Sequence, residues 1–240
     1  MELIMKRFLL VAAAVGVAAF SNAQVINEFV NNHTGADTDE FIEIFGLANT
    51  DYSNLTVVEI EGDGTSAGLI DDMTFALGTT DANGFWTTGF KNNIAENGTM
   101  TYLLVSGYTG ALNNDVDVDN DGVIDTFFWN AIIDSVGVTD GGAGDWVYST
   151  TVLDGSTPPT GFTVGGASRI PNGLDTDSAS DWVRNDFDGD GLPSFGNTGT
   201  TVWPEAYNTP GAVNRQAVPE PATLAVLGLG AVALLRRRKA

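Results

Sequence analysis

An aspartate-rich segment between residues 115 and 125 carries the clearest chemical signal in the sequence. Carboxylates stand at Asp115, Asp117, Asp119, Asp121 and Asp125. Alternate carboxylates converge on one cation when a turn follows them, and Gly122, at the sixth position counted from Asp117, supplies that turn. Ile124 then fills the apolar eighth position. The spacing predicts a calcium loop with Asp117, Asp119, Asp121 and Asp125 as the ligands.

The twelfth position of this segment departs from a complete EF-hand loop. It holds Phe128, where such a loop has a bidentate glutamate. The departure favours a structural site of an extracellular protein, for which affinities of roughly 10⁻⁴ to 10⁻³ M suffice. The alternative is a solvated acidic turn. We favour bound calcium because crowded carboxylates repel one another unless a cation neutralises them or solvent separates them.

A second and weaker metal candidate follows later in the chain. It consists of Asp186, Asp188 and Asp190, with Asp175 and Asp177 shortly before them. Pro193 and Ser194 stand where an apolar residue and a further ligand are needed. A hairpin loop rich in Asp and Gly is therefore an equally good interpretation.

The remaining chemistry is restricted. The chain has no cysteine and one histidine, His33, which excludes disulfides, thiolate zinc sites and metal sites with two histidines. His33 lies in a polar stretch, and no serine stands in a nucleophile motif. A hydrolase with a carboxylate pair is the enzymatic alternative, and its candidates are Glu28, Glu40, Glu43, Glu59 and Glu96. Because glutamates of strands in an acidic protein are usually surface residues, we expect no enzymatic activity.

Two tryptophans suggest another alternative, a carbohydrate-binding module. Trp86 and Trp146 are both flanked by glycine-rich sequence and could offer a surface for sugar stacking. Trp129 and Trp182 stand among apolar residues, which is typical of a core.

The charge distribution limits the partners. Residues 24–217 contain 29 acids and four cations, a net charge of −25, because six of the ten Lys and Arg residues lie outside that stretch. Nucleic-acid binding draws much of its affinity from phosphate neutralisation by Lys and Arg. We therefore expect no nucleic-acid partner, and divalent cations are the favoured ionic partners.

Both ends of the chain have the pattern of targeting segments. Lys6 and Arg7 precede an apolar run over 8–20 and small residues before Gln24, which predicts a secretory signal cleaved between Ala23 and Gln24. At the other end Pro219, Glu220 and Pro221 precede an uncharged apolar run over 222–235. A basic tail follows, made of Arg236, Arg237, Arg238 and Lys239. A helix over that run would be about 21 Å long against roughly 30 Å of hydrocarbon, so it suits transient rather than permanent anchoring.

The order of motif, short apolar helix and basic tail resembles the PEP-CTERM sorting signal of Gram-negative bacteria. The resemblance implies recognition by an exosortase, a membrane protein that processes its substrate near the motif and delivers it to the exterior. An ordinary tail anchor is the alternative. We expect transient membrane anchoring, followed by a cell-surface or extracellular location.

The body between these ends reads as β-structure. Short β-branched and aromatic runs alternate with turns, and no segment has a convincing amphipathic helical pattern. The expected strands are 25–30, 41–45, 55–60, 73–77, 100–105, 127–133, 146–148, 162–164 and 182–183. The spacing predicts an all-β antiparallel sandwich, in which strand 41–45 is buried on both faces except at Glu43.

Segments at both ends of the body resemble the lamin-tail domain of secreted bacterial proteins. The resemblance rests on 25–30, 39–44 and 51–55, and on 168–173, 175–177, 181–183 and 209–214. It implies an immunoglobulin-like sandwich used for binding or scaffolding, here with a large insertion between the two halves. We thus expect a signal peptide (1–23), a lamin-tail-like body (24–217) and a sorting signal (218–240). The expected function is that of a calcium-stabilised surface or matrix protein, with exosortase, the membrane and extracellular polysaccharide as partners.

Overall fold

The computed structural model describes residues 24–32, 38–95, 97–155, 164–185 and 206–216. These residues form strands and two 3-10 helices, η1 (Gly64–Ser66) and η2 (Ala179–Asp181). The strands are β1 (Val25–Val30), β2 (Phe41–Phe45), β3 (Leu55–Glu61), β4 (Ile70–Ala76), β5 (Phe85–Thr87), β6 (Met100–Ser106), β7 (Ala131–Thr139), β8 (Val152–Asp154), β9 (Gly166–Arg169), β10 (Trp182–Arg184), β11 (Ala206–Tyr207) and β12 (Arg215–Gln216). The expected all-β class is confirmed for the described residues.

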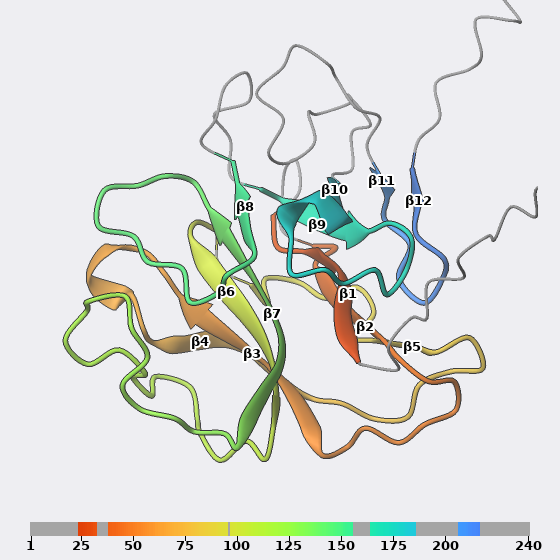
Figure 1. The fold of residues 1–240 in the computed structure, drawn as a ribbon, viewed down its shortest axis with the longest axis horizontal. Helices are drawn as coiled ribbons and strands as arrows, with labels where there is room; N and C mark the ends of the chain where they lie inside the picture. Colours follow the sequence, from red (N-terminus) through yellow and green to blue (C-terminus); the bar gives the residue numbers. More distant parts are fainter. Residues whose placement is uncertain (1–23, 33–37, 96, 156–163, 186–205, 217–240) are drawn as a thin grey trace, which may run out of the picture.

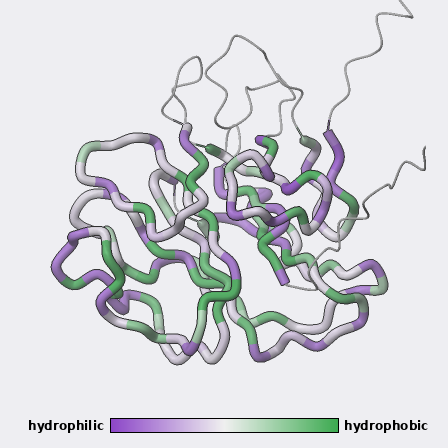
Figure 2. The backbone as a smooth tube through the Cα atoms, viewed as in Figure 1, coloured by the Kyte–Doolittle hydropathy of each residue, from purple (hydrophilic) through white to green (hydrophobic). Residues whose placement is uncertain are grey.

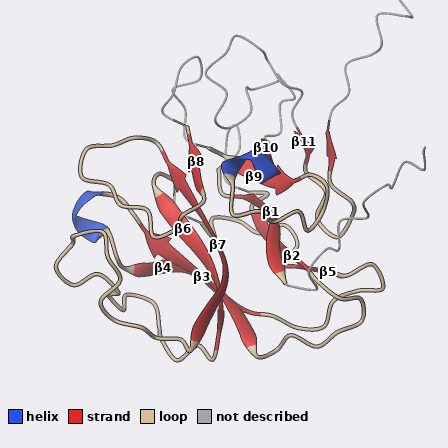
Figure 3. Ribbon diagram, viewed as in Figure 1, coloured by secondary structure: helices blue, strands red, loops and turns tan. Residues whose placement is uncertain are grey.

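The strands form two five-stranded sheets and a small ribbon of β11 and β12 (Figures 1 and 3). The first sheet has the order β10-β9-β1-β2-β5 and the second has the order β4-β3-β6-β7-β8. The ring centroids of Phe29 in β1 and Tyr102 in β6 lie 5.0 Å apart, so the sheets pack on one another.

The core between the sheets follows from the alternation of side chains along each strand. Ile42 and Ile44 of β2 face Val57 of β3 and Leu104 of β6 within one buried cluster. Green hydrophobic stretches follow these strands in Figure 2. In β1 a bulge at Asn27 shifts the register, and it lets Ile26 and Phe29, three residues apart, both join the core.

The central part of the chain is not a separate lobe. All strands of the second sheet lie between residues 55 and 154, while the first sheet joins β1, β2 and β5 to β9 and β10 from the later part. The central part of the chain therefore supplies one sheet of the sandwich and the edge strand β5 of the other. The expectation of a wholly antiparallel arrangement is wrong, because β8 pairs with β7 in parallel and Asn185 forms an isolated parallel bridge with Ala206. The loop 140–151 is long enough to carry the chain back to start β8 in the same direction.

Most of the expected strands are present, and the errors have identifiable causes. The runs at 25–30, 41–45, 55–60, 73–77, 100–105 and 182–183 all overlap strands. The run at 127–133 is wrong at its start, since β7 begins at Ala131, and the run at 146–148 is a loop. In these segments Trp129 and Tyr148 are buried although the backbone around them is irregular. The pattern of apolar residues in the sequence does not distinguish such burial from that of a strand.

A second apolar cluster covers part of the outer face of the second sheet. Val58 and Ile60 of β3 and Leu103 and Val105 of β6 contribute from the sheet. Loop residues cover them, namely Val116, Trp129 and Tyr148, with Tyr108, Ile124 and Phe128 at the margin. The aspartate-rich loop is thus fixed against a sheet rather than free in solvent.

The outer face of the first sheet is covered by the turn that precedes β12. Glu28 and Glu43 stand opposite each other on β1 and β2 and are fully buried. Glu28 accepts hydrogen bonds from the Thr209 backbone N–H (3.0 Å) and the Thr209 hydroxyl (3.1 Å). Glu43 accepts hydrogen bonds from the Gly211 N–H (2.5 Å) and the Asn27 amide (2.8 Å). The expectation that Glu43 is the exposed position of its strand is wrong, because the turn supplies the donors that burial requires.

Two further contacts hold this region together. The Asn214 amide donates to the backbone oxygens of Asn27 (3.1 Å) and Arg169 (3.0 Å). The Arg169 guanidinium pairs with Asp134 of β7 at 3.1 Å and lies over the Trp182 ring at 4.5 Å. Because Arg169 belongs to the first sheet and Asp134 to the second, this buried ion pair joins the two sheets.

The buried carboxylates predict that stability falls as pH rises. Burial raises the pKa of Glu43 from 4.5 to about 8 against its hydrogen bonds, and repulsion by Glu28 adds to the shift. Burial also raises the pKa of Glu28, and that of Asp134 to about 6 despite Arg169. Between pH 4.5 and about 8, the folded protein thus keeps a proton on Glu43 that the unfolded chain has already released. The free energy of unfolding therefore falls as pH rises through that window.

Urea unfolding at pH 5, 6, 7 and 8 measures this slope. Glu43→Gln should unfold more easily at low pH but show a flatter pH dependence. The control Asp51→Asn should keep the wild-type slope, because the Asp51 pKa is lowered and its linkage lies at lower pH. A stability that increases with pH, or an unchanged slope in Glu43→Gln, would contradict the assignment.

Candidate functional site: two carboxylate clusters

The loop at 117–122 folds around one buried carboxylate. Asp117 is fully buried, and its Oδ1 accepts a hydrogen bond from the Asp121 N–H (3.1 Å). Its Oδ2 accepts hydrogen bonds from the Gly122 N–H (2.8 Å) and the Tyr148 hydroxyl (2.8 Å). Gly122 has a φ of +84°, as the turn at the sixth loop position requires. The loop geometry is therefore held by hydrogen bonds within the protein.

Three of the four predicted ligands come together. Carboxylate oxygens of Asp117, Asp119 and Asp121 all lie within 4.8 Å of one another. Asp125 is not in this group; its side chain is exposed and its N–H donates to Val116 O at 2.7 Å. Ile124 packs against the second apolar cluster, so the interpretation of the eighth position is confirmed.

The electrostatics of this loop favour a cation. The pKa of Asp119 is raised chiefly by repulsion from Asp121, with contributions from slight desolvation, Asp125 and Asp117. An all-carboxylate donor set suits a hard divalent ion such as calcium. Because calcium takes six to eight oxygens, backbone carbonyls and water would have to supply the other ligands.

Trp146 covers this loop. A Cβ added at Gly122 would approach the Trp146 ring, and the indole N–H of Trp146 donates to Asn120 O at 3.1 Å. Trp86 lies in β5 at the edge of the first sheet and packs against the main core. The two tryptophans considered for sugar stacking thus belong to different environments. Trp129 and Trp182 are core residues, as the sequence indicates.

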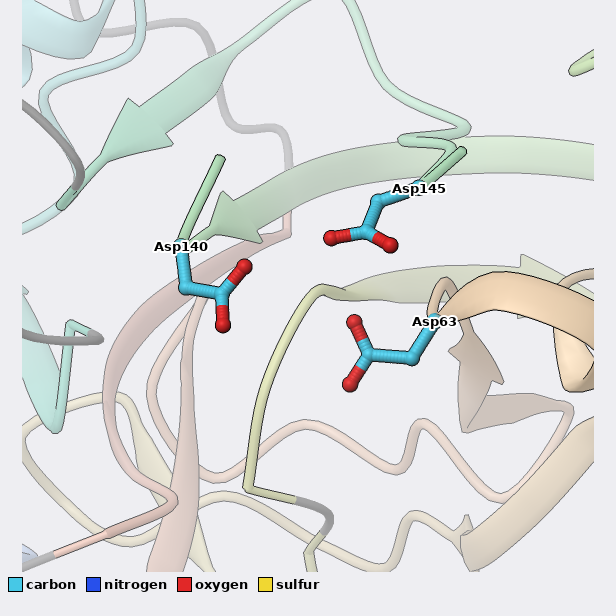
Figure 4. Close-up of side chains that lie close together, drawn as sticks. All are labelled: Asp63, Asp140 and Asp145. Atoms are coloured by element: carbon cyan, nitrogen blue, oxygen red, sulfur yellow. The ribbon is translucent and has the colours of Figure 1, made fainter. Parts of the chain in front are cut away.

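A second carboxylate cluster was missed by the sequence reasoning. Asp63, Asp140 and Asp145 converge from two separate loops, and their oxygens also lie within 4.8 Å of one another (Figure 4). In the antiparallel order β3-β6-β7, the end of β3, the start of β6 and the end of β7 meet at one edge of the sheet. Asp63 and Asp140 follow two of these strands. No local spacing could reveal this group, because only strand pairing brings its members together.

Thr99 organises the second cluster. Its backbone N–H donates to Asp63 at 3.0 Å and its hydroxyl donates to Asp145 at 3.0 Å. Burial raises the pKa of Asp63, the Thr99 N–H lowers it, and repulsion by Asp145 and Asp140 raises it further. Neighbouring residues link the two clusters, since Asp145 belongs to one and Trp146 covers the other. The backbone N–H of Trp146 donates to Gly62 O at 2.9 Å.

The structure describes only some of the other predicted site residues. Asp175 is a partner of Arg169, at 2.9 Å, which gives it a structural role. Gln24 precedes β1, so cleavage after Ala23 would leave that strand whole. Outside the described residues lie Ala23, His33, Glu96, Asp186, Asp188, Asp190, Pro219, Glu220, Pro221, Arg236, Arg237, Arg238 and Lys239. Among the described residues no helix is long and apolar enough to cross a membrane.

Comparison with known protein families identifies one motif, at the C-terminal end of the sequence. Residues 217–239 match the PEP-CTERM protein-sorting motif, which begins directly after β12. Neither curated proteins nor solved structures give a match to the chain. The chain therefore carries a PEP-CTERM sorting motif next to a β-sheet body, and it is an exported protein sorted by an exosortase.

Proposed function

We propose that this protein is a non-enzymatic structural or binding module that an exosortase delivers to the cell surface or the extracellular matrix. The observation that carries the proposal is the position of the sorting motif. The motif starts at residue 217, and β12 ends at Gln216. The sorting motif is therefore joined directly to β12, the strand that follows the covering turn. The body is thus the part of the chain that the motif would deliver to the exterior.

The location of the glutamates supports a role without catalysis. Glu28, Glu40, Glu43 and Glu59 are fully buried in the strands or at their margins. A polymeric substrate cannot contact a carboxylate that is covered in this way. The donors around Glu28 and Glu43 come from the chain itself, which is typical of a structural network.

The arrangement of the two ends supports a lamin-tail-like, immunoglobulin-like body. Of the segments that carry that resemblance, 25–30, 39–44, 168–173 and 181–183 contribute strands to the first sheet, where Glu28 of β1 pairs with Ser168 of β9, whereas 51–55 leads into β3 of the second sheet. The turn at 209–214 docks on the same sheet. The resemblance thus concerns mainly residues of the first sheet and of the turn that covers it.

Calcium bound at Asp117, Asp119 and Asp121 is the second part of the proposal. The converging oxygens, the repulsion that raises the Asp119 pKa and the turn at Gly122 support it. The ion would fix the loop that covers the outer face of the second sheet. Its contribution would be to stability, because the loop belongs to the second apolar cluster.

Calcium should raise the melting temperature of the exported protein. At 10 mM calcium, an affinity of roughly 10⁻⁴ to 10⁻³ M corresponds to a rise of roughly 3 to 10 °C. Asp119→Asn should be neutral or stabilising in EDTA, since it relieves repulsion, and it should lose the response to calcium. Thermal unfolding with and without calcium measures both effects.

Two controls make the calcium test specific. Asp51→Asn removes a charge at an exposed turn that can keep its bond to the Ser53 N–H, and it should respond as the wild type does. Asp140→Asn alters only the second cluster. A response that Asp119→Asn keeps, or that only Asp140→Asn removes, would contradict calcium binding at the first loop.

Removal of the sorting motif should change the destination of the protein. A chain that stops after Gln216 keeps every described strand and should still leave the cytoplasm, but it should be missing from the surface and medium fractions. The double variant Pro219→Ala/Pro221→Ala keeps the apolar run and the basic tail, and it should show the same defect. Quantitative immunoblots of cell fractions measure the distribution. Normal sorting of the double variant would mean that the tail works as an anchor and not as an exosortase signal.

A further inference from the structure

The ribbon of β11 and β12 turns one side to the body and the other to solvent. Tyr207 and Arg215 stand directly opposite each other in its register, so their side chains share one face. Both side chains are exposed. Ala206, next to Tyr207, is buried, and so is Asn214, next to Arg215. The ribbon therefore has an inner face against the body and an outer face that carries Tyr207 and Arg215.

Val213 extends this outer face. Its side chain is 57% exposed, whereas the amide of the following Asn214 donates to two backbone oxygens of the first sheet, at 3.1 and 3.0 Å. Exposure therefore alternates along 213–215, as in a strand with one buried side. Tyr207, Val213 and Arg215 together are called the ribbon face below. An aromatic, an aliphatic and a cationic side chain side by side are typical of the boundary between a membrane and water.

The charge of the chain changes at this ribbon. Residues 206–218 contain no Asp or Glu, and Arg215 is their one charged residue. Residues 24–205 contain 29 acids and three cations, a net charge of −26. Arg215 forms no ion pair with a described residue, so its charge is available to a partner. Close to an anionic surface, the field of the body would therefore turn the ribbon face towards that surface and the acidic remainder away from it.

The length of the chain after β12 keeps this ribbon close to a membrane that holds the tail. Residues 217–221 alone separate Gln216 from the apolar run at 222–235. A connection of this length spans roughly 20 Å when it is fully extended. A helix over the run would be about 21 Å long against roughly 30 Å of hydrocarbon. With the basic tail on the far side, the start of the run is drawn into the bilayer, which brings the ribbon still closer to the lipid.

We propose that the ribbon face rests on the anionic phospholipid surface of the membrane while the tail is anchored. Arg215 binds a lipid phosphate, the Tyr207 ring lies at the level of the headgroups, and Val213 reaches the boundary of the acyl chains. Because the inner face of the ribbon is hydrogen-bonded to the first sheet, the contact fixes how the body stands on the bilayer. It thereby holds Pro219 to Pro221 at the membrane face for the exosortase. The inference deepens the proposed function and rests on it.

Fluorescence quenching in lipid vesicles tests the contact. The chain has no cysteine, so a single Val213→Cys variant can carry one nitrobenzoxadiazole fluorophore. The precursor is purified with its sorting motif from a host without an exosortase. It is reconstituted in vesicles of phosphatidylethanolamine and phosphatidylglycerol that contain lipids with spin-labelled headgroups. EDTA is present, so that calcium cannot bridge the acidic loop to the lipid. Most of the emission from position 213 should be lost.

Val123→Cys is the matched control. Val123 is 59% exposed, close to the 57% of Val213, and it lies in the loop that covers the second sheet. The turn that carries Val213 covers the outer face of the first sheet, so the two positions belong to opposite sides of the sandwich. Emission from position 123 should be unchanged by the spin label. Equal quenching at both positions, or quenching at neither, would overturn the proposal.

Arg215→Glu tests the charge of the ribbon face. One cation near an anionic surface shifts the ratio of docked to undocked protein about five-fold, so reversal of the charge should lower that ratio about thirty-fold. In the vesicles, the added substitution should abolish the quenching at position 213. In the native host, it should make unprocessed precursor accumulate in the membrane fraction. Normal processing of a variant that has lost the quenching would refute the positioning role.

The vesicles separate lipid docking from the other possible outcomes. They contain no exosortase, so accumulation of the Arg215→Glu precursor in cells without any quenching by lipid would assign the ribbon face to the enzyme and overturn the proposal. Normal sorting of Pro219→Ala/Pro221→Ala would refute the sorting role, while the quenching at position 213 would be unaffected. Failure of the docking and failure of the proposed function therefore give distinct results.

Discussion

Removal of a carboxylate from water costs several kcal/mol unless donors replace the lost hydration. This constraint shapes the body, because Glu28, Glu43, Asp117 and Asp134 are all buried. Each receives at least one donor from a segment distant in sequence. Thr209 and Gly211 serve the two glutamates, Tyr148 serves Asp117, and Arg169 serves Asp134. The tertiary structure is therefore the means by which an acidic chain buries part of its carboxyl groups.

The same contacts explain the layered arrangement. Each sheet has one face on the common core and one face under a cover, the turn at 209–214 over the first sheet and the loop at 107–130 over the second. The Arg169–Asp134 pair joins the layers from within. The covers also carry the candidate functions, because the first leads into the sorting motif and the second contains the loop proposed to bind calcium.

Local pattern was enough to predict several strands and the convergence of three of the acidic side chains. The strands β1, β2, β3 and β6 could be predicted because β-branched and aromatic residues recur between turn residues. The convergence of Asp117, Asp119 and Asp121 could be predicted because their spacing is local. Asp125 is not among the converging carboxylates, since its N–H donates to Val116 O and its side chain stays in solvent.

Contacts between residues distant in the chain could not be predicted from the sequence pattern. Asp63, Asp140 and Asp145 meet only because three strands end at one edge of a sheet. Glu43 is buried only because the turn at Gly211 covers it. The strand β7 was placed too early because Asp134, Ser135 and Gly137 dilute its apolar pattern, and pairing with β6 overrides that local preference.

The central claim is that the folded body is delivered to the exterior after processing at both ends. Intact mass spectrometry of the protein recovered from the medium and the surface fraction of the host tests it most directly, since one mass reads both termini. The account predicts a species that begins at Gln24 and ends near Pro219–Pro221. A surface species that retains Arg236 to Lys239 would contradict it and would identify the tail as a permanent anchor.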